Sequence, residues 1–178
     1  VHALCAVIND LLGSLGRTVI LHALDEPATP QHAALADLVQ AMQAGAVDAL
    51  LLLNVNPVYD APAALGFAEA LAQVPEVIHL GLHVDETARR SSWHLPSAHY
   101  LEPWGDGRAY DGTLSVIQPL IAPLYEAAHS PLEVLALLAS GEEQSAYDLV
   151  RNTWRQLLAG RGAFEQAWQR VLHDGFLP

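Results

Sequence analysis

The order of apolar and polar residues predicts alternating helices and strands along the first half of the chain. Leucine, isoleucine and valine recur at helical spacing over residues 4–12 and stop at Gly13, which indicates a first helix. Residues 18–22 are rich in β-branched and aliphatic side chains and predict a short buried strand. Thr29 and Pro30 are residue types that start helices, so a second helix is expected to follow them.

Two further strands are predicted by continuous apolar runs of the kind that lies between layers of helices. Residues 48–54 form the first run and residues 77–82 the second, and a helix beginning near residues 60–62 is expected between them. This pattern is typical of βαβ units, whose right-handed crossovers place helices on the faces of a parallel sheet. The sequence therefore predicts an α/β fold with a mostly parallel, Rossmann-like sheet that has helices on both faces.

The middle of the chain predicts one more strand and then a long irregular loop. Residues 98–101 fit a fourth strand, whereas glycines and prolines interrupt every regular period across residues 103–123. Long ordered loops tend to be functional, and aromatic residues on such loops often anchor interfaces. We therefore expect residues 93–125 to form a contact surface, with sheet-edge capping as the alternative. Its aromatic residues are Trp93, Tyr100, Trp104, Tyr110 and Tyr125.

The last third of the chain predicts extra C-terminal helices. Serine and glutamate three residues apart form a capping box at residues 130–133, and the same spacing recurs at residues 140–143. Helical apolar stripes follow over residues 147–158 and 164–172. The large core candidates in these stripes are Trp154 and Trp168. Because no linker or repeat divides the chain, residues 1–178 are predicted to form a single domain.

Composition excludes several classes of function. The net charge is −12, and all eight basic residues are scattered arginines, so nucleic acid is not an expected partner. No apolar run reaches the roughly 20 residues of a membrane-spanning helix, so direct membrane insertion is not expected. The single cysteine, Cys5, is expected to be a small buried residue, and one thiol cannot ligate an iron–sulfur cluster. The start at Val1, inside a predicted helix, indicates a piece of a larger protein.

Three segments, residues 48–62, 79–113 and 117–125, carry motifs that resemble the molybdopterin oxidoreductase family. The resemblance extends over most of residues 1–125, the family-like core, and leaves residues 126–178 as added C-terminal helices. The motifs match a family pattern of an Asn-Pro loop, a Glu-Thr-Ala turn and a Leu-Pro followed by Glu and Gly. They fall on residues 54–57, 86–88, 95–96, Glu102 and Gly105. The pattern is most similar to the molybdopterin-oxidoreductase-like iron–sulfur subunit of alternative complex III, a quinol-oxidising respiratory complex.

This resemblance implies two possible functions. Ordinary members of the family bind molybdopterin guanine dinucleotide between several domains, whereas the alternative complex III branch is thought to lack the pterin and to hold iron–sulfur clusters elsewhere in the chain. Two departures from the family pattern favour loss of the pterin in this chain. Asn54 replaces the usual glycine, and Trp93 and His94 replace small or aliphatic residues. We therefore expect a non-catalytic, pterin-free domain of an electron-transfer subunit, and the alternative is one lobe of a working molybdenum site.

The branch also implies partners and a location for the parent protein. Its partners would be other domains of the same chain and subunits of a membrane-associated respiratory complex. The parent would be peripheral on the outer, periplasmic face of a bacterial cytoplasmic membrane. No cofactor is expected in residues 1–178 themselves, while the parent would carry iron–sulfur clusters or, in the alternative, molybdopterin guanine dinucleotide.

Any ligand of such a sheet would bind beyond the carboxyl ends of the strands, at residues 23–26, 54–59 and 83–87. If a pterin cofactor is bound, the candidate residues are Asn54, Asn56, Pro57, Asp85, Glu86 and Thr87. The acidic residues among these loops include Asp25 and Glu26, and they would repel a pyrophosphate. In the absence of a cofactor, residues 54–57 are expected to be a structural turn.

Other chemistries have little support in the sequence. The turn from Gly13 to Gly16 precedes a predicted strand and lacks the Lys-Ser/Thr pair of a phosphate-binding loop. No nucleophile motif of a hydrolase is present. The residues that could suggest a metal site match no common ligand spacing, and they are His94, His99, Glu102 and Asp106. A free-standing nucleotide-binding α/β protein is a third, generic alternative.

Overall fold

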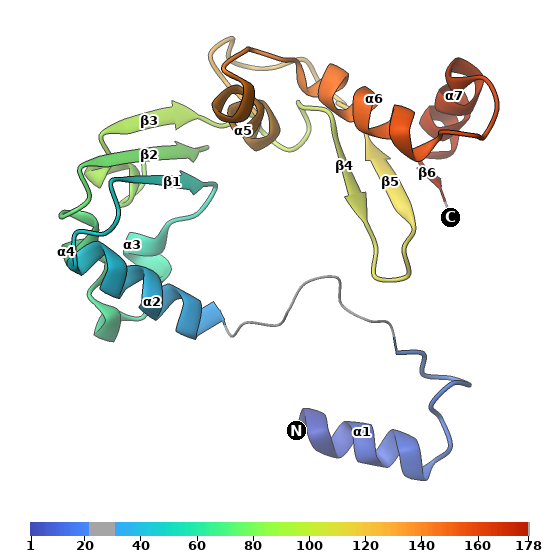
Figure 1. Cartoon of the computed structure of the whole chain (residues 1–178), viewed down its shortest axis with the longest axis horizontal. Coiled ribbons are helices and arrows are strands. Elements are labelled where there is room, and N and C mark those ends of the chain that lie inside the picture. The colour runs from blue at the N-terminus through green and yellow to red at the C-terminus, as the bar shows by residue number, and fades with distance from the viewer. Residues whose placement is uncertain (22–30, 178) are drawn as a thin grey trace.

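The chain folds into a parallel sheet, an antiparallel sheet and helices that pack on each of them (Figure 1). The computed structural model describes residues 1–21 and 31–177. The strands are β1 (Ala49–Leu53), β2 (Glu76–Gly81), β3 (Trp93–Pro96), β4 (Gly105–Arg108), β5 (Leu114–Ile117) and β6 (Phe176–Leu177). The helices are α1 (His2–Leu11), α2 (Gln31–Gln43), α3 (Pro57–Asp60), α4 (Phe67–Leu71), α5 (Pro131–Ser140), α6 (Ala146–Leu157) and α7 (Phe164–Asp174), with short 3-10 helices η1 (Ala63–Leu65) and η2 (Ala88–Arg90). The fold is thus α/β, with two small sheets in place of one larger Rossmann-like sheet.

The parallel sheet has the strand order β1-β2-β3. Leu50 of β1 is level with Val77 of β2, and His79 of β2 is level with His94 of β3. Side chains alternate between the two faces of a strand, so these register partners all lie on one face of the sheet. The two strands that the apolar runs predicted are therefore confirmed as β1 and β2, and they are parallel.

One face of this sheet is covered by α2 and α4. The predicted second helix is confirmed as α2, and its residues Val39 and Met42 are buried. They belong to a hydrophobic cluster that also contains Leu52, Phe67, Ala70, Leu71, Val74 and Val77. Burial of such side chains contributes about 1.5 to 3 kcal/mol each, which makes this layer the main stabilising contact of the sheet.

The opposite face of the sheet meets α5 across an apolar groove. Ile78 of β2 and Leu95 of β3 line it from the sheet, and leucines of α5 line it from the other side. The groove has a volume of about 520 Å³, and we call it the α5 groove. Its lining residues are Ile78, Leu95, His129, Glu133, Val134, Leu137, Leu138, Glu143, Gln144 and Ser145.

The antiparallel sheet carries the second hydrophobic cluster. β4 and β5 form a hairpin, and β6 at the end of the chain pairs with β5. Trp154 of α6 and Trp168 of α7 are buried, as their helical spacing predicted. They pack with Val116, Val150, Leu158 and Val171. The predicted C-terminal helices are thus confirmed, and they cover a sheet of their own.

Helix starts explain part of this arrangement. α5 begins with the predicted capping box: the Ser130 hydroxyl accepts from the Glu133 N–H, and the Glu133 carboxylate accepts from the Ser130 N–H at 2.8 Å. The box predicted at residues 140–143 is wrong, because Ser140 is the last residue of α5. The next helix, α6, is capped instead by Ser145, whose hydroxyl accepts from the Asp148 N–H.

The N-terminal segment differs most from the sequence prediction. α1 is a helix as predicted, but no residue of 1–21 is buried, and Cys5 is exposed instead of packed. Residues 18–21 form no strand beyond an isolated bridge between Leu15 and Val19, because no neighbouring strand supplies hydrogen bonds to them. The remaining residues of those predictions, His22, Thr29 and Pro30, lie outside the described residues, as do Asp25 and Glu26.

Three other elements also differ from the prediction. The helix predicted from residue 60 is broken into short pieces because Gly66 adopts a left-handed backbone at φ +62°. The prediction of a strand at residues 98–101 is wrong. The third strand of the sheet, β3, lies earlier in the chain, at residues 93–96, where it pairs with β2. The loop predicted at residues 103–123 contains the β4-β5 hairpin. In the described part of the chain, no helix combines the length and apolar character needed to cross a membrane.

The predicted aromatic contact surface divides into two parts. Trp104 is half-buried against Tyr147, with ring centroids 4.9 Å apart, and it packs on the second hydrophobic cluster. Trp104 therefore stabilises the fold of this chain, and the prediction that it is a free interface anchor is wrong. The other aromatic residues of this stretch are exposed, and they are Trp93, Tyr100, Tyr110 and Tyr125.

Candidate functional site

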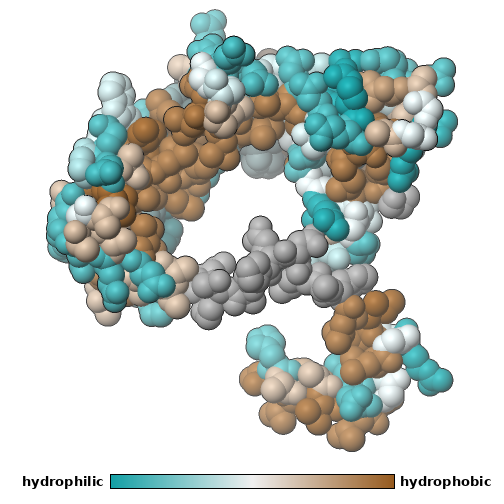
Figure 2. Space-filling model, in the orientation of Figure 1, coloured by the Kyte–Doolittle hydropathy of each residue, from teal (hydrophilic) through white to brown (hydrophobic). Residues whose placement is uncertain are grey.

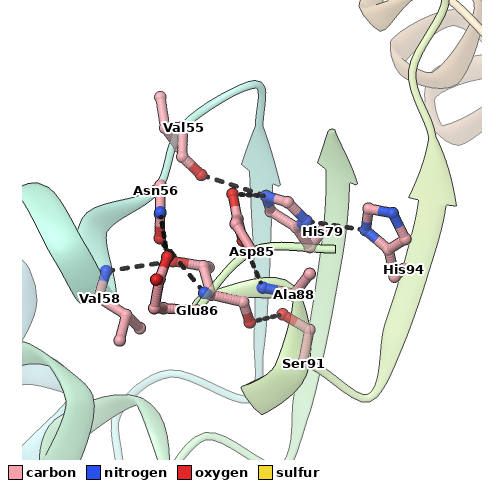
Figure 3. Close-up of polar contacts among 10 residues, drawn as sticks. Val55, Asn56, Val58, His79, Asp85, Glu86, Ala88, Ser91 and His94 are labelled. Carbon is pink, nitrogen blue, oxygen red and sulfur yellow. Dashed lines mark hydrogen bonds and ion pairs between the residues drawn. The ribbon is translucent and has the colours of Figure 1, made fainter. Parts of the chain in front are cut away.

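The candidate site lies where the parallel strands end, because their carboxyl ends meet at one edge of the sheet (Figure 3). The loop after β1 and the loop after β2 touch here through their side chains, and β3 contributes His94. The structure joins three of the six predicted residues, Asn56, Glu86 and Thr87, in one hydrogen-bonded network. The other three, Asn54, Pro57 and Asp85, lie beside it, and Asp85 accepts from the N–H of Ala88 instead.

Asn54 forms the turn out of β1 with a left-handed backbone, φ +52°. Its N–H donates to the carbonyl of Leu80 at 2.8 Å, so the turn is held against β2. Glycine adopts this conformation without cost, and asparagine tolerates it better than most other residues. The position thus keeps a glycine-like backbone but adds a side chain, as expected from the sequence.

Asn56 joins the two loops. Its side-chain N–H donates to a Glu86 carboxylate oxygen at 2.8 Å. Its side-chain oxygen accepts from the Thr87 hydroxyl at 2.6 Å and from the Thr87 N–H at 3.2 Å. Thr87 is fully buried, and its hydroxyl oxygen also accepts from the Val58 N–H at the start of α3, next to Pro57. The side chain of Asn56 therefore has partners for both its amide nitrogen and its carbonyl oxygen.

The two acidic residues differ in their roles. Asp85 accepts a hydrogen bond from the Ala88 N–H at 2.8 Å, which holds the short helix η2. Glu86 is exposed, and the hydrogen bond from the Asn56 side chain lowers the pKa of its carboxyl, with a backbone N–H acting in the same direction. Glu86 therefore stays ionised, and negative charge faces solvent at this edge.

A histidine pair supports the site from inside the sheet. His79 is 1% exposed, and its Nδ1 lies 3.0 Å from Nδ1 of His94, while its Nε2 lies 3.2 Å from the carbonyl oxygen of Val55. The carbonyl can only accept, so Nε2 of His79 donates to it. The other nitrogen of His79, Nδ1, shares a hydrogen bond with Nδ1 of His94, in which one ring donates and the other accepts. Nε2 of His79 also lies 3.9 Å from a carboxylate oxygen of Asp85.

We expect the His94 ring to make folding pH-dependent. Burial lowers the pKa of His94, and charge on His79 acts in the same direction, whereas Asp85 opposes them. A histidine with a lowered pKa binds protons better in the unfolded chain, where its pKa is about 6.5. Its contribution to stability is thus complete above about pH 6.5 and is lost as the pH falls through the folded-state value.

Urea unfolding between pH 7.5 and 5 measures this effect. The free energy of unfolding should fall less steeply with decreasing pH in His94→Gln than in the parent chain. His173→Gln is the matched control, because the His173 side chain is 88% exposed and lies 2.8 Å from a carboxylate oxygen of its neighbour Asp174. Equal slopes in all three proteins would contradict the prediction.

The site fits a dinucleotide poorly. Phosphates are bound at such loops by free backbone N–H groups and close backbone approach. Here the N–H groups of Val58, Thr87 and Ala88 already donate to side chains of the same chain. The Asn54 side chain adds bulk at the turn, and the ionised Glu86 would repel a phosphate.

Sequence reasoning missed the histidine pair. The available signal was His79, a polar residue in the middle of an otherwise apolar strand, but its partner could not be known without the register of β3. The residues considered as a metal site have other partners: His94 pairs with His79, the Glu102 carboxylate accepts from the backbone N–H of His99, and Asp106 accepts from the Trp154 indole. Within residues 1–21 and 31–177, no three His, Cys, Asp or Glu side chains are grouped to hold a metal ion.

Comparison with known proteins identifies a distant relative. No family model matches the chain. The chain is 29% identical over 150 residues to the molybdopterin-binding-like subunit of menaquinone reductase from Nitratidesulfovibrio vulgaris. It is a distant homologue of that subunit. The match covers 73% of this chain and spans only about a fifth, 21%, of the length of the relative.

Proposed function

We propose that this chain is a pterin-free, non-catalytic domain of an electron-transfer subunit in a respiratory complex that reacts with quinones. The observation that carries the proposal is the closed strand-end site. The polar groups of Asn56 and Thr87 form hydrogen bonds with each other and with the surrounding loop. A loop tied in this way serves as structure, and the exposed Glu86 next to it disfavours a phosphate ligand.

Distant homology supports the respiratory setting. The relative is a subunit of a menaquinone reductase, and its name describes it as molybdopterin-binding-like. By this homology, the partners of the present chain would be other domains of its parent and other subunits of a membrane-associated complex. Iron–sulfur clusters would be held by the parent outside residues 1–178, since Cys5 is the only thiol here. The parent would lie on the periplasmic face of the membrane.

Exposed apolar residues indicate where such partners would bind. The loop at residue 101 accepts hydrogen bonds from the N–H groups of Leu120 and Ile121, so two distant segments form one surface. Large side chains on this surface are open to solvent, and they are Tyr100, Leu120, Leu124 and Tyr125. Large apolar side chains exposed on neighbouring segments are candidates for a contact site.

One observation favours the alternative, in which the chain is one lobe of a molybdopterin guanine dinucleotide site. Asn54 retains the left-handed turn that would let the backbone approach a ligand. Binding would then require the Asn56–Glu86 contact to open, and other domains would have to supply positive charge. The two functions therefore differ in cofactor content.

Cofactor analysis of the purified chain and of its full-length parent tests the proposal. We expect neither protein to contain stoichiometric molybdenum by elemental analysis, nor a pterin by fluorescence of acid-oxidised extracts. A working molybdenum oxidoreductase processed in parallel shows that the extraction succeeds. Stoichiometric molybdenum or pterin in the parent would overturn the proposal and support the alternative.

A further inference from the structure

We propose that α1 docks in the α5 groove of its own chain and covers the open face of the parallel sheet. This inference is independent of the proposed function. It begins with the surface of α1, where aliphatic side chains recur at helical spacing and are exposed; Figure 2 shows hydrophobic residues on this part of the molecule. The exposed fractions are 67% for Leu4, 54% for Val7, 54% for Ile8 and 80% for Leu11.

α1 needs a partner surface in order to remain helical. None of its residues is buried, and no basic residue lies in its last turn to interact with the helix dipole. Because most helical stability in proteins comes from packing of an apolar face, the aliphatic residues of α1 require a surface to pack on.

The α5 groove has the matching chemistry. Ile78 and Leu95 of the sheet and three aliphatic residues of α5 form its apolar lining, and five polar residues complete the lining. Leu137 and Leu138 are 40% and 59% exposed, so both sides of the proposed contact now face solvent. Figure 2 shows hydrophobic residues gathered over the sheet and α5 as well as on α1. α1 itself carries one carboxylate, Asp10, and no arginine. The proposed contact is therefore made by apolar packing and does not depend on ion pairs.

The covalent connection is long enough for α1 to reach the groove. Only residues 22–30 separate Leu21 from α2, a length that reaches about 35 Å when fully extended. α2 lies on one face of the three-stranded sheet, and the groove lies on the other. Layers are about 10 Å apart and strands about 5 Å apart, so the chain can reach around the sheet edge. Such a short connection also gives an effective concentration in the millimolar range, which favours the same chain over a second copy.

The single cysteine provides a direct test. Cys5 is exposed on α1, one helical turn from Ile8. We expect Leu138→Cys to form an intramolecular disulfide with Cys5 under mild oxidation at low micromolar protein, detected as a reducible monomer of increased gel mobility. Gln156→Cys, an exposed position on α6 away from the groove, is the matched control and should react at least about tenfold more slowly.

Two outcomes of this cross-linking would overturn the proposal. Equal rates for Leu138→Cys and Gln156→Cys would show that α1 does not prefer the groove. A predominant disulfide-linked dimer would show that the occupant is α1 of a second copy.

Hydrogen exchange gives a second readout that needs no cross-link. Backbone amides of α1 in the full chain should exchange about tenfold or more slowly than in a free peptide of residues 1–12. Leu138→Asp in the groove should remove this protection, whereas Leu135→Asp, which is also exposed on α5 but does not line the groove, should not. Peptide-like exchange of α1 in the unmodified chain would overturn the docking.

Discussion

Replacing Trp154 with alanine is expected to lower the free energy of unfolding by about 3 to 5 kcal/mol. The indole is 0% exposed, and its ring lies 6.0 Å from that of Trp168 at the centre of the second cluster. Its Nε1 also donates to a carboxylate oxygen of Asp106 at 3.2 Å. The substitution therefore leaves a cavity and removes a partner of Asp106, and both effects destabilise α6 on the antiparallel sheet.

Urea unfolding followed by far-UV circular dichroism measures this loss. Trp93→Ala is the control, since Trp93 is 62% exposed and its removal should change stability by about 0.5 kcal/mol or less. Trp154→Phe keeps most of the buried volume and should lose less, about 1.5 to 3 kcal/mol, which is the usual contribution of a hydrogen bond to a carboxylate. Similar losses for Trp154→Ala and Trp93→Ala would mean that α6 does not pack as described.

Gly81→Ala is expected to destabilise the parallel sheet by about 1 to 3 kcal/mol through overpacking. A Cβ atom at this position would lie 2.5 Å from Cε1 of the His79 ring and 3.1 Å from its Nε2. The ring cannot move away cheaply, because it is buried and both of its nitrogens are held by Val55 and His94. The absent side chain of Gly81 thus makes room for the histidine pair.

Gly107→Ala is the matched control for this prediction. Gly107 lies in β4 with no atom within 4 Å of an added Cβ and without a positive φ, so its replacement should be nearly neutral. The double variant Gly81→Ala/His79→Ala should lose less free energy of unfolding than the two single variants lose in sum. The reason is that His79→Ala removes the ring with which the new methyl group clashes. Strict additivity in chemical unfolding would argue against the clash.

The success of the sequence prediction depended on where the structural signal lay. β1, β2 and the C-terminal helices carry their information locally, in continuous apolar runs and in the capping serine Ser130, so they were predicted correctly. β3 contains Trp-His-Leu-Pro, and β4 contains two glycines; neither is an apolar run, and both form strands because a neighbouring strand pairs with them.

The candidate site was predictable in its position but not in its contacts. Ends of parallel strands meet at one edge, so residues 54–57 and 85–87 were expected near each other. The Asn56 side chain forms hydrogen bonds with Glu86 and Thr87, which lie about thirty positions away in the chain. These contacts depend on the geometry of the two loops, which the sequence does not reveal. His79 and His94 were missed as a pair for the same reason, since a one-residue shift of β3 would move them to opposite faces.

The separate hydrophobic clusters have a consequence for spectroscopy. Trp104, Trp154 and Trp168 all contact the cluster on the antiparallel sheet, whereas the cluster beneath β1 and β2 contains no tryptophan. Emission from the shielded indoles therefore reports the melting of the C-terminal part alone, while ellipticity at far-ultraviolet wavelengths sums over both. If the clusters melt independently, the two signals will trace different curves, and a single midpoint will describe neither half of the chain.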